Sequence, residues 1–572
     1  MLIAGSAQAA EPSPLAPAEA IFLDFLDANG AVGAIDSGLY ADFKGRSRES
    51  WDADVKDRHA ALMKALAALD VERLSSADQA ALAAMRVTLA DWGDPSPAVA
   101  NAPEGPACKD RTDQTLDYDG LSAALSACFR EIGNHLKFED RTIDRGGALG
   151  LWYDLEDPAR RKALHDAFFP LWAALNGGNE PDSPYRRLIR LAAAAENTNG
   201  SGVEAAARAI GVSVADVEQW LVRILETWRD ATGPDLVEPW DYRFTIGEGG
   251  RRLGDSFSGD ILALDHRFYR DLGVDLDALG VVYDIKDRPD KSPLAYTDFL
   301  TRGRYLPGGE WEKTIARVVG RYEDGGLSSL NELVHENGHA VHISAIRNRP
   351  AFTDWTDTIF TEAFADVPSW SVYEPAWQKK YLGTSLPVGM SLRGLFGSVM
   401  MDVAWSLFEI RMLRDPAQDP NQLWTDLTRE YLHIKPHPEV AWWAVRVQLV
   451  SRPGYMVNYG LGAVLTAEMR RATAGAIGTF DAGNPRWHGW TSEKLIRFGS
   501  QKSAKTLMQE LLGRPVAPDA LLAELRRIEG AGPLQSDVVN VDSTATMFPF
   551  PATLWMPTWN SAPGGRSLAG IR

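Results

Sequence analysis

Apolar residues recur every three or four positions through most of the N-terminal half, and this period constrains the fold most. A Ser75-Ser76 pair just before one apolar run is typical of a helix N-terminus. The clearest segments are residues 54–91, 121–136, 158–175, 185–195 and 214–228. The pattern predicts an all-helical lobe over residues 20–235.

The pattern changes after Pro239. Residues 281–285 (VVYDI) and 316–319 (ARVV) are short, β-branched and bounded by Gly, Pro or Asp, which is typical of strands in a small sheet. Helical periodicity resumes near residue 327 and continues to about 528. We therefore expect a mainly α fold in four parts: a leader at 1–19, a helical lobe at 20–235, a catalytic region at 236–530 and a Pro- and Ser-rich tail at 531–572.

Composition excludes two classes of function. The 572 residues carry 59 Lys and Arg against 77 Asp and Glu, a net charge of −18. Nucleic-acid binding normally requires a basic face, and the sequence shows no basic stripe with interleaved aromatic residues. No apolar run approaches the roughly 18 to 20 residues that span a bilayer. We expect neither a nucleic-acid partner nor a membrane span.

The N-terminal residues and the two cysteines indicate the compartment in which the protein is found. Residues 7–9 (AQA) resemble the cleavage end of a secretory signal, although the basic and most of the apolar parts of such a signal are missing. Cys108 and Cys128 could form a disulfide in an oxidising compartment, or they could be two unrelated buried thiols. These features favour a periplasmic or secreted protein over the alternative, a cytoplasmic one.

The strongest chemical signal is residues 330–342 (LNELVHENGHAVH). On a helix, His335 and His339 lie on one face and can bind a single metal ion. Glu336 follows directly and can act as general base toward a metal-activated water. A His-acid-x-x-His match is expected by chance only about 0.02 times in a chain of this composition. The segment therefore predicts a buried helix that holds one Zn²⁺ ion.

A third ligand is expected from a neighbouring helix, because catalytic zinc sites have three protein ligands and one open position. Glu362 and Asp366 follow within residues 360–369 (FTEAFADVPS), one helical turn apart. One can ligate the metal while the other orients an imidazole. Glu362 has the longer side chain, so we predict it as the ligand and Asp366 as the orienting acid.

These segments resemble the zinc peptidases of the thimet oligopeptidase and peptidyl-dipeptidase family and, locally, the angiotensin-converting-enzyme family. The resemblance extends to residues 237–244 (VEPWDYRF), 283–291 (YDIKDRPDK) and 507–514 (LMQELLGR), and so covers about half the chain. The thimet-like pattern places the third ligand at Asp366, and the converting-enzyme pattern places it at Glu362. We follow the second, which preserves a glutamate ligand.

The resemblance also implies a later helix whose tyrosines stabilise the tetrahedral intermediate. Residues 454–462 (GYMVNYGLG) match this element, with Tyr455 and Tyr459 four apart. His342, which recurs in the thimet-like family, is expected to be structural or to support the ligands.

This chain departs from the family pattern at three positions. Val450 and Gly462 stand where a His and a further Tyr are usual, and Asn337 replaces an apolar residue inside the zinc motif. Arg446, Arg452 and His437 are candidates to replace the missing groups, although each could equally be structural.

The resemblance implies two helical lobes that flank a deep channel, with a small sheet beside the zinc-binding helix. It also implies hydrolysis of short unfolded peptides, as an oligopeptidase or a dipeptidyl carboxypeptidase. Residues 311–322 could offer a strand edge to the substrate. Two alternatives remain: a zinc amidase acting on a modified amide, and a catalytically silent peptide-binding protein. The sequence leaves the oligomeric state open.

Overall fold

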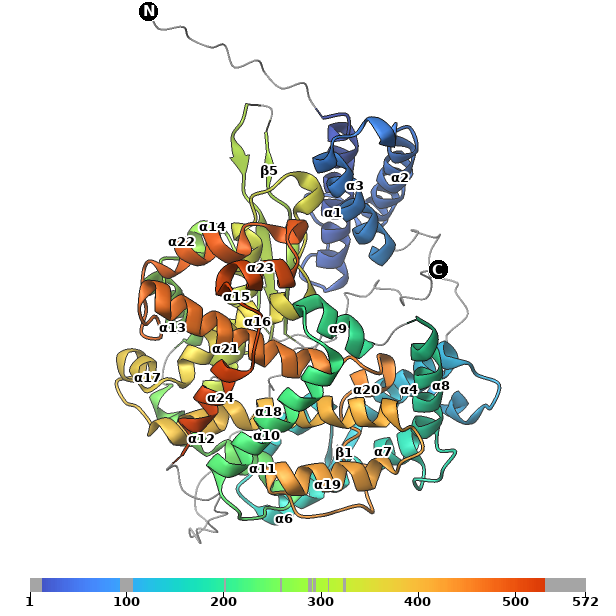
Figure 1. Ribbon diagram of the computed structural model, residues 1–572, viewed down its shortest axis with the longest axis vertical. Coiled ribbons are helices and arrows are strands. Elements are labelled where there is room, and N and C mark those ends of the chain that lie inside the picture. Colours follow the sequence, from blue (N-terminus) through green and yellow to red (C-terminus); the bar gives the residue numbers. More distant parts are fainter. Residues whose placement is uncertain are drawn as a thin grey trace, which may run out of the picture.

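The computed structural model describes residues 13–92, 106–199, 202–257, 260–286, 291, 295–306, 308–322 and 326–529. The protein is mainly helical, as predicted, with short strands beside the central helices (Figure 1). The sequence features at residues 7–9 and the predicted tail at 531–572 lie outside the described residues. None of the described helices is long and apolar enough to cross a bilayer.

Three N-terminal helices form a bundle that lies apart from the other helices (Figure 1). They are α1 (Ala16–Asp36), α2 (Arg48–Ala67) and α3 (Ser76–Trp92). Their apolar side chains form a core with Leu300, Ala351 and Phe352, separate from the core of the rest of the protein. At Gly30 a Cβ would lie 2.9 Å from the carbonyl oxygens of Phe299 and Leu300, so only glycine lets α1 approach the strand so closely.

Ion pairs attach this bundle to the body. Arg349 donates to Glu19 at 2.8 Å and to Asp78 at 2.9 Å, and Arg304 donates to Asp24 at 2.6 Å. Because Glu19 is buried, its pairing with Arg349 fixes where α1 meets the body.

The remainder of the predicted N-terminal lobe is also helical, with one exception. Its helices are α4 (Tyr118–Cys128), α5 (Arg145–Asp154), α6 (Pro158–Asp166), α7 (Phe169–Asn176), α8 (Pro184–Asn199), α9 (Gly202–Ile210) and α10 (Val214–Thr232). The exception is a hairpin of β1 (Leu136–Phe138) and β2 (Arg141–Ile143). The expectation of an all-helical lobe is therefore wrong at this point. Glu139 has a φ of 55° at the hairpin turn, a conformation that ends helical periodicity.

Cys108 and Cys128 form a disulfide, which confirms the first of the two alternatives. The bond attaches the residues before α4 to the end of that helix. Ser122, also on α4, donates a hydrogen bond to the backbone carbonyl of Val450 at 2.8 Å. The disulfide thus braces the helix that supports the segment leading to Tyr455.

The central sheet has three strands in the order β3–β7–β4. β3 (Val282–Asp284) runs parallel to β7 (Ile315–Val319), and β4 (Tyr296–Thr301) runs antiparallel to β7. The two strands predicted from sequence pair directly, as β3 and β7. β5 (Arg304–Tyr305) and β6 (Trp311–Glu312) form a separate hairpin. The prediction that residues 311–322 offer a free edge is wrong for β7, because both of its edges are paired.

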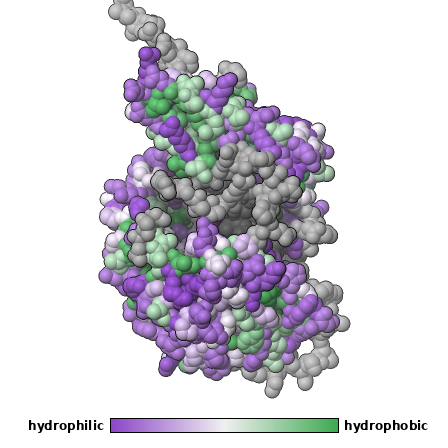
Figure 2. Space-filling model, turned by 90° about the vertical axis from the view of Figure 1, so that its right-hand side faces the viewer, coloured by the Kyte–Doolittle hydropathy of each residue, from purple (hydrophilic) through white to green (hydrophobic). Residues whose placement is uncertain are grey.

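The remaining helices complete the main core, and α15 among them packs against β4 and β7. Before the sheet come α11 (Pro239–Ile246), α12 (Glu248–Leu253), α13 (Ile261–Asp271) and α14 (Leu276–Leu279). After it come α15 (Gly326–Ala345), α16 (Thr358–Ser369), α17 (Pro375–Leu382), α18 (Val388–Arg414), α19 (Pro420–Leu432), α20 (Gln448–Ser451), α21 (Val457–Ile477), α22 (Trp487–Thr491), α23 (Ala504–Leu512) and α24 (Asp519–Arg526). Hydrophilic residues cover most of the face shown in Figure 2, with smaller apolar areas between them.

Candidate metal centre

Helix α15 carries the His-Glu-x-x-His segment and is buried on every side from Ser329 to Ile343. Because the helix lies in the interior, its two histidines are shielded from solvent. Gly338 lies between them. A Cβ there would stand 2.9 Å from the Cα of Ala365, so the backbones of α15 and α16 touch at this point. This contact brings Glu362 of α16 opposite the histidines.

The three predicted ligands converge. His335 Nε2 and His339 Nε2 lie 3.1 Å apart, and the Glu362 carboxylate oxygens lie 3.4 Å from His335 Nε2 and 3.7 Å from His339 Nε2. Ligands bound tetrahedrally to zinc at about 2.0 to 2.1 Å stand about 3.4 Å from one another. Among the described residues, this is the one cluster of His, Cys, Asp or Glu with metal-binding spacing. Two imidazoles and a carboxylate are a donor set that suits zinc.

Asp366 lies on the other side of His335. It accepts a hydrogen bond from His335 Nδ1 at 2.8 Å and a weaker one from the Ser369 hydroxyl at 3.2 Å. This contact leaves Nε2 of His335 facing Glu362, the arrangement found where a carboxylate orients a metal-binding imidazole. Burial alone would lower the pKa of His335, but the adjacent Asp366 and Glu362 carboxylates hold it well above its usual range.

His339 differs from His335 in its surroundings. Burial lowers the pKa of His339 to about 3, and the neighbouring His335 lowers it further while Glu362 opposes the shift. A neutral imidazole is the form that binds a metal. Its Nδ1 has no hydrogen-bond partner among the described residues, so His339 lacks the orienting carboxylate that His335 has.

Glu336 is buried next to the three converging side chains. Thr297, on β4, lies with its hydroxyl 2.7 Å from the Glu336 carboxylate and 2.9 Å from the Glu336 backbone carbonyl. Burial raises the pKa of Glu336 to about 7, Glu362 adds to the increase, and His335 and the Thr297 hydrogen bond oppose it. A carboxyl group with a pKa near neutrality can both accept and return a proton.

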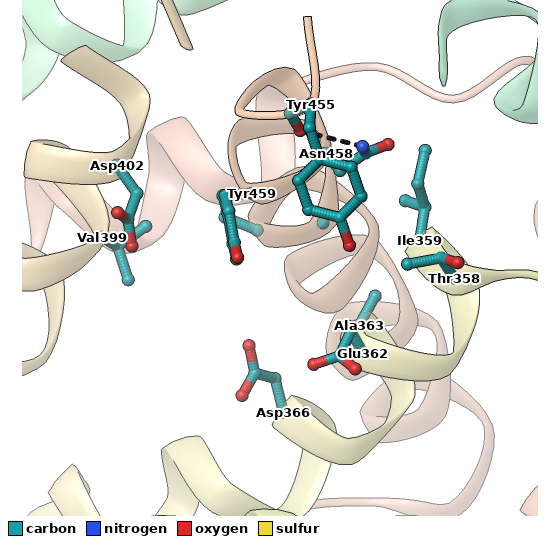
Figure 3. A pocket seen from close by; sticks show the side chains of 12 residues that line it. Thr358, Ile359, Glu362, Ala363, Asp366, Val399, Asp402, Tyr455, Asn458 and Tyr459 are labelled. Carbon is teal, nitrogen blue, oxygen red and sulfur yellow. Dashed lines mark hydrogen bonds between the residues drawn. The ribbon is translucent and has the colours of Figure 1, made fainter. Parts of the chain in front are cut away.

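Tyr455 and Tyr459 lie across a pocket from Glu362 and Asp366 (Figure 3). Tyr459 is in the first turn of α21 and Tyr455 just precedes it, and both line the pocket together with Glu362 and Asp366. Their rings are 5.8 Å apart and nearly perpendicular. Thr466, further along α21, donates to the Ala363 backbone carbonyl at 3.0 Å, which holds α21 against α16. The structure thus places both predicted tyrosines on the pocket wall that faces the predicted ligand Glu362.

His342 packs among aromatic rings. Trp355, Phe360 and Phe364 surround it, and neither ring nitrogen has a hydrogen-bond partner among the described residues. Burial lowers the pKa of His342 to about 3, and the neighbouring His339 lowers it further. These contacts agree with the expectation that His342 has a structural role.

Asn337 is held by hydrogen bonds on both ends of its side chain. It donates to Asp265 at 2.6 Å and accepts from the Tyr283 hydroxyl at 2.8 Å. Burial raises the pKa of Asp265 well above its usual range, and the hydrogen bond from Asn337 opposes this. Asn337 therefore connects α15 to α13 and β3 by hydrogen bonds, and its side chain is buried.

None of the candidate replacements for the missing His and Tyr lines the pocket. His437 pairs with Glu238 at 3.0 Å and with Glu439 at 2.7 Å, and Arg452 lies over the Tyr455 ring at 5.9 Å. Arg446 is buried and paired with Asp402. At Gly462, which lines the pocket, an added Cβ would meet nothing within 4 Å. The missing tyrosine thus leaves open space in the pocket wall.

Sequence reasoning missed two residues near the site. Thr297 contacts Glu336 from a strand that was not predicted, and Asp402 lines the pocket from α18. Neither residue belongs to a recognisable sequence motif, because packing between elements that are distant in the sequence brings each of them to the site.

No protein-family profile and no curated protein sequence is similar to the chain. Many solved structures are similar to it, among them the following two. One is an M32 carboxypeptidase from Deinococcus radiodurans R1, with 16% identity and a TM-score of 0.47 over 90% of this chain and 98% of that one. The other is metallocarboxypeptidase 1 of Trypanosoma cruzi, with 13% identity and a TM-score of 0.48 over 90% and 99%. Neither is described as a thimet oligopeptidase or an angiotensin-converting enzyme, so that resemblance stays a prediction. At these values the similarity defines neither the reaction nor the site residues of this chain.

Proposed function

We propose that the protein is a zinc-dependent peptidase that hydrolyses short unfolded peptides, of the oligopeptidase or dipeptidyl carboxypeptidase type. The observation that carries the proposal is Glu336: a buried carboxylate, oriented by Thr297, directly beside three converging metal-type donors. A protein that only bound a metal or a peptide would gain nothing from a buried acid at this position, where burial is unfavourable for its charged form.

In this proposal, His335, His339 and Glu362 hold one zinc ion, and Asp366 orients His335. Zinc bound there would lower the pKa of a water molecule and polarise the peptide carbonyl. The Glu336 carboxylate accepts a proton from the attacking water and then donates it to the leaving amine. The hydroxyl groups of Tyr455 and Tyr459 face the same pocket and are placed to donate hydrogen bonds to the developing oxyanion.

The disulfide between Cys108 and Cys128 supports a periplasmic or secreted location, because such bonds persist mainly in oxidising compartments. Location remains part of the proposal. Fractionation of the native host, with detection of the protein by antibody, would test it.

The decisive experiment compares the zinc-loaded protein with its Glu336→Gln variant on a mixed peptide library, read by mass spectrometry. We expect cleavage by the parent protein alone, with metal content and circular dichroism unchanged in the variant. Equal cleavage by both proteins would remove Glu336 from the mechanism. No cleavage by either, with zinc bound, would favour the modified-amide or silent-binder alternatives.

A further inference from the structure

A buried glycine on α21 leaves an unfilled hollow in the wall of the pocket. Gly462 is shielded from solvent and lines the pocket together with Glu362. A Cβ added at Gly462 would meet no atom within 4 Å apart from the backbone of its own helix. Protein interiors are normally packed closely enough to leave few such gaps. The absent side chain therefore leaves space that a group from outside the protein can fill.

Packing between helices does not explain the glycine at this position. Two residues earlier, a Cβ at Gly460 would lie 2.7 Å from the Leu221 side chain, so close approach requires a glycine there. Gly462 has no such neighbour, and glycine in a helix interior is less stable than alanine. The open space at Gly462 thus comes at the expense of helix stability.

The helices on either side of the pocket are held together beside the hollow. The Thr466 hydroxyl lies 3.0 Å from the backbone carbonyl oxygen of Ala363 on α16 and 3.0 Å from that of Gly462. Thr466 therefore connects the turn of α21 that begins at Gly462 to the helix that carries Glu362. The space beside Gly462 belongs to this packed arrangement of the two helices.

Most of the surface that the pocket presents is apolar. Ile359 and Ala363 come from α16, Val399 from α18 and Ala463 from α21. In Figure 3, Ile359 and Val399 lie on opposite sides of the pocket. Apolar surface favours an apolar guest, because both lose their contact with water when the guest enters.

The acidic side chains of the pocket already have partners. Asp402 pairs with the buried Arg446, and Asp366 accepts a hydrogen bond from His335. Glu362 faces the two histidines of α15. Because these charges are compensated within the protein, the pocket favours a neutral side chain over a basic one.

The size of the pocket limits the guest. Its cavity volume is about 30 Å³. By this measure a water molecule needs roughly 10 to 15 Å³, so the cavity has room for about two or three water molecules. An aliphatic side chain of a few carbon atoms fits such a space better than the fused rings of tryptophan.

We propose that the hollow beside Gly462 is a subsite for one aliphatic side chain of the substrate, of about the size of valine or leucine, and that Gly462 determines this preference. The inference rests on the proposed peptidase function and narrows its substrate class. Because the predicted ligand Glu362 lines the same pocket, the side chain belongs to a residue next to the cleaved bond. Binding strengthens with each methylene group that leaves water.

The test uses peptides that differ in one residue, placed on one or the other side of the cleaved bond. That residue is Ala, Val, Leu, Trp or Lys, and mass spectrometry locates the bond. The zinc-loaded protein gives kcat/KM for each peptide. Calorimetry with the Glu336→Gln variant measures binding without turnover.

The variants are Gly462→Ala and Gly462→Val, each also combined with Glu336→Gln for the binding measurements. Gly475→Ala and Gly475→Val are the matched controls. Gly475 is exposed on the same helix, and a Cβ there also meets nothing within 4 Å. These controls carry the same change in helix propensity away from the pocket.

We expect the parent protein to prefer Leu over Ala at one of the two positions by about 10- to 100-fold in kcat/KM, the effect of a few buried methylene groups. Trp and Lys should be accepted no better than Ala. Gly462→Val should remove most of the preference by weakening only the larger aliphatic peptides, and Gly462→Ala should remove part of it. Both Gly475 variants should retain it.

Thermal unfolding shows whether each variant is folded. Gly462→Ala should unfold at the parental temperature or above, because alanine is the better helix former and its Cβ meets no neighbour. This variant therefore carries the test if Gly462→Val fails to fold.

Three results would overturn the subsite: equal cleavage and binding of the Ala and Leu peptides by the parent protein, a preference for Trp or Lys, or an equal loss for all peptides in Gly462→Ala. Any of these with cleavage by the parent protein would leave the peptidase function standing. Binding that favours Leu and is lost in the Gly462 variants, without any cleavage, would retain the subsite and reject the peptidase.

Discussion

Thr297 and Glu336 are joined by a hydrogen bond of 2.7 Å between the threonine hydroxyl and the glutamate carboxylate. The bond connects the edge strand β4 to the zinc-motif helix. It positions one carboxylate oxygen, and in the proposed mechanism the other would accept the proton of the attacking water, so the sheet determines which way the proposed base points.

Replacing Thr297 with Val removes the hydroxyl and keeps the shape nearly unchanged. We expect kcat to fall about 10-fold or more, the value of a hydrogen bond to a charged group, with KM and zinc content unchanged. Steady-state kinetics with metal analysis would measure this. Thr297→Ser should retain most of the activity, and a Val variant at the parental rate would show that Glu336 needs no such support.

Glu362 and Asp366 should differ sharply in their effect on metal affinity. Glu362→Ala removes a predicted ligand, whereas Asp366→Asn removes only the carboxylate that orients His335, a change typically worth about 10- to 100-fold in metal affinity. We expect the Glu362 variant to lose more than this in a chelator competition assay. The opposite order would make Asp366 the ligand, as the thimet-like pattern has it.

His165 should make the protein less stable in mild acid. Trp152, Phe169, Trp172 and Trp240 surround its ring, and burial lowers its pKa from 6.5 to about 4. Between these values the unfolded chain binds a proton that the folded protein does not, so the free energy of unfolding falls as the pH falls from 6.5 to 4. It is unaffected by this group above pH 6.5.

The His165→Phe variant should lack that part of the pH dependence. Urea unfolding at pH 7.5 and pH 5 would measure it, with the variant losing less stability than the parent by about 2 kcal/mol, following the size of the shift. The exposed His135 offers a matched control, His135→Phe. Identical losses in all three proteins would show that His165 does not titrate on unfolding.

The disulfide should contribute substantially to stability. Closing a loop of about 20 residues lowers the entropy of the unfolded chain by an amount worth about 3 kcal/mol. We expect the Cys108→Ser/Cys128→Ser double variant to unfold at a lower urea concentration than the oxidised parent. Reductant should lower the urea midpoint of the parent and leave that of the double variant unchanged. If reductant lowered the midpoint of both proteins, the loss of stability would have a cause other than the disulfide.

An element could be predicted from the sequence where the pattern that indicates it lies within the element itself. Helix α15 is encoded locally, since its two histidines lie four residues apart with apolar residues around them, and β3 and β7 are short β-branched runs. The β1–β2 hairpin was missed because its residues continue an apolar helical pattern up to the turn at Glu139. The hydrogen bonds of Thr297 with Glu336 and of Thr466 with Ala363 join residues 39 and 103 positions apart. Such contacts depend on packing between elements, about which local periodicity says nothing.

The backbone contact at Gly338 has a consequence for ion selectivity. Because α15 and α16 touch there without an intervening side chain, the two helices cannot move closer to narrow the space between the histidines and Glu362. In the proposed zinc site, adjustment to a smaller ion would therefore come from the side chains, above all from the Glu362 carboxylate.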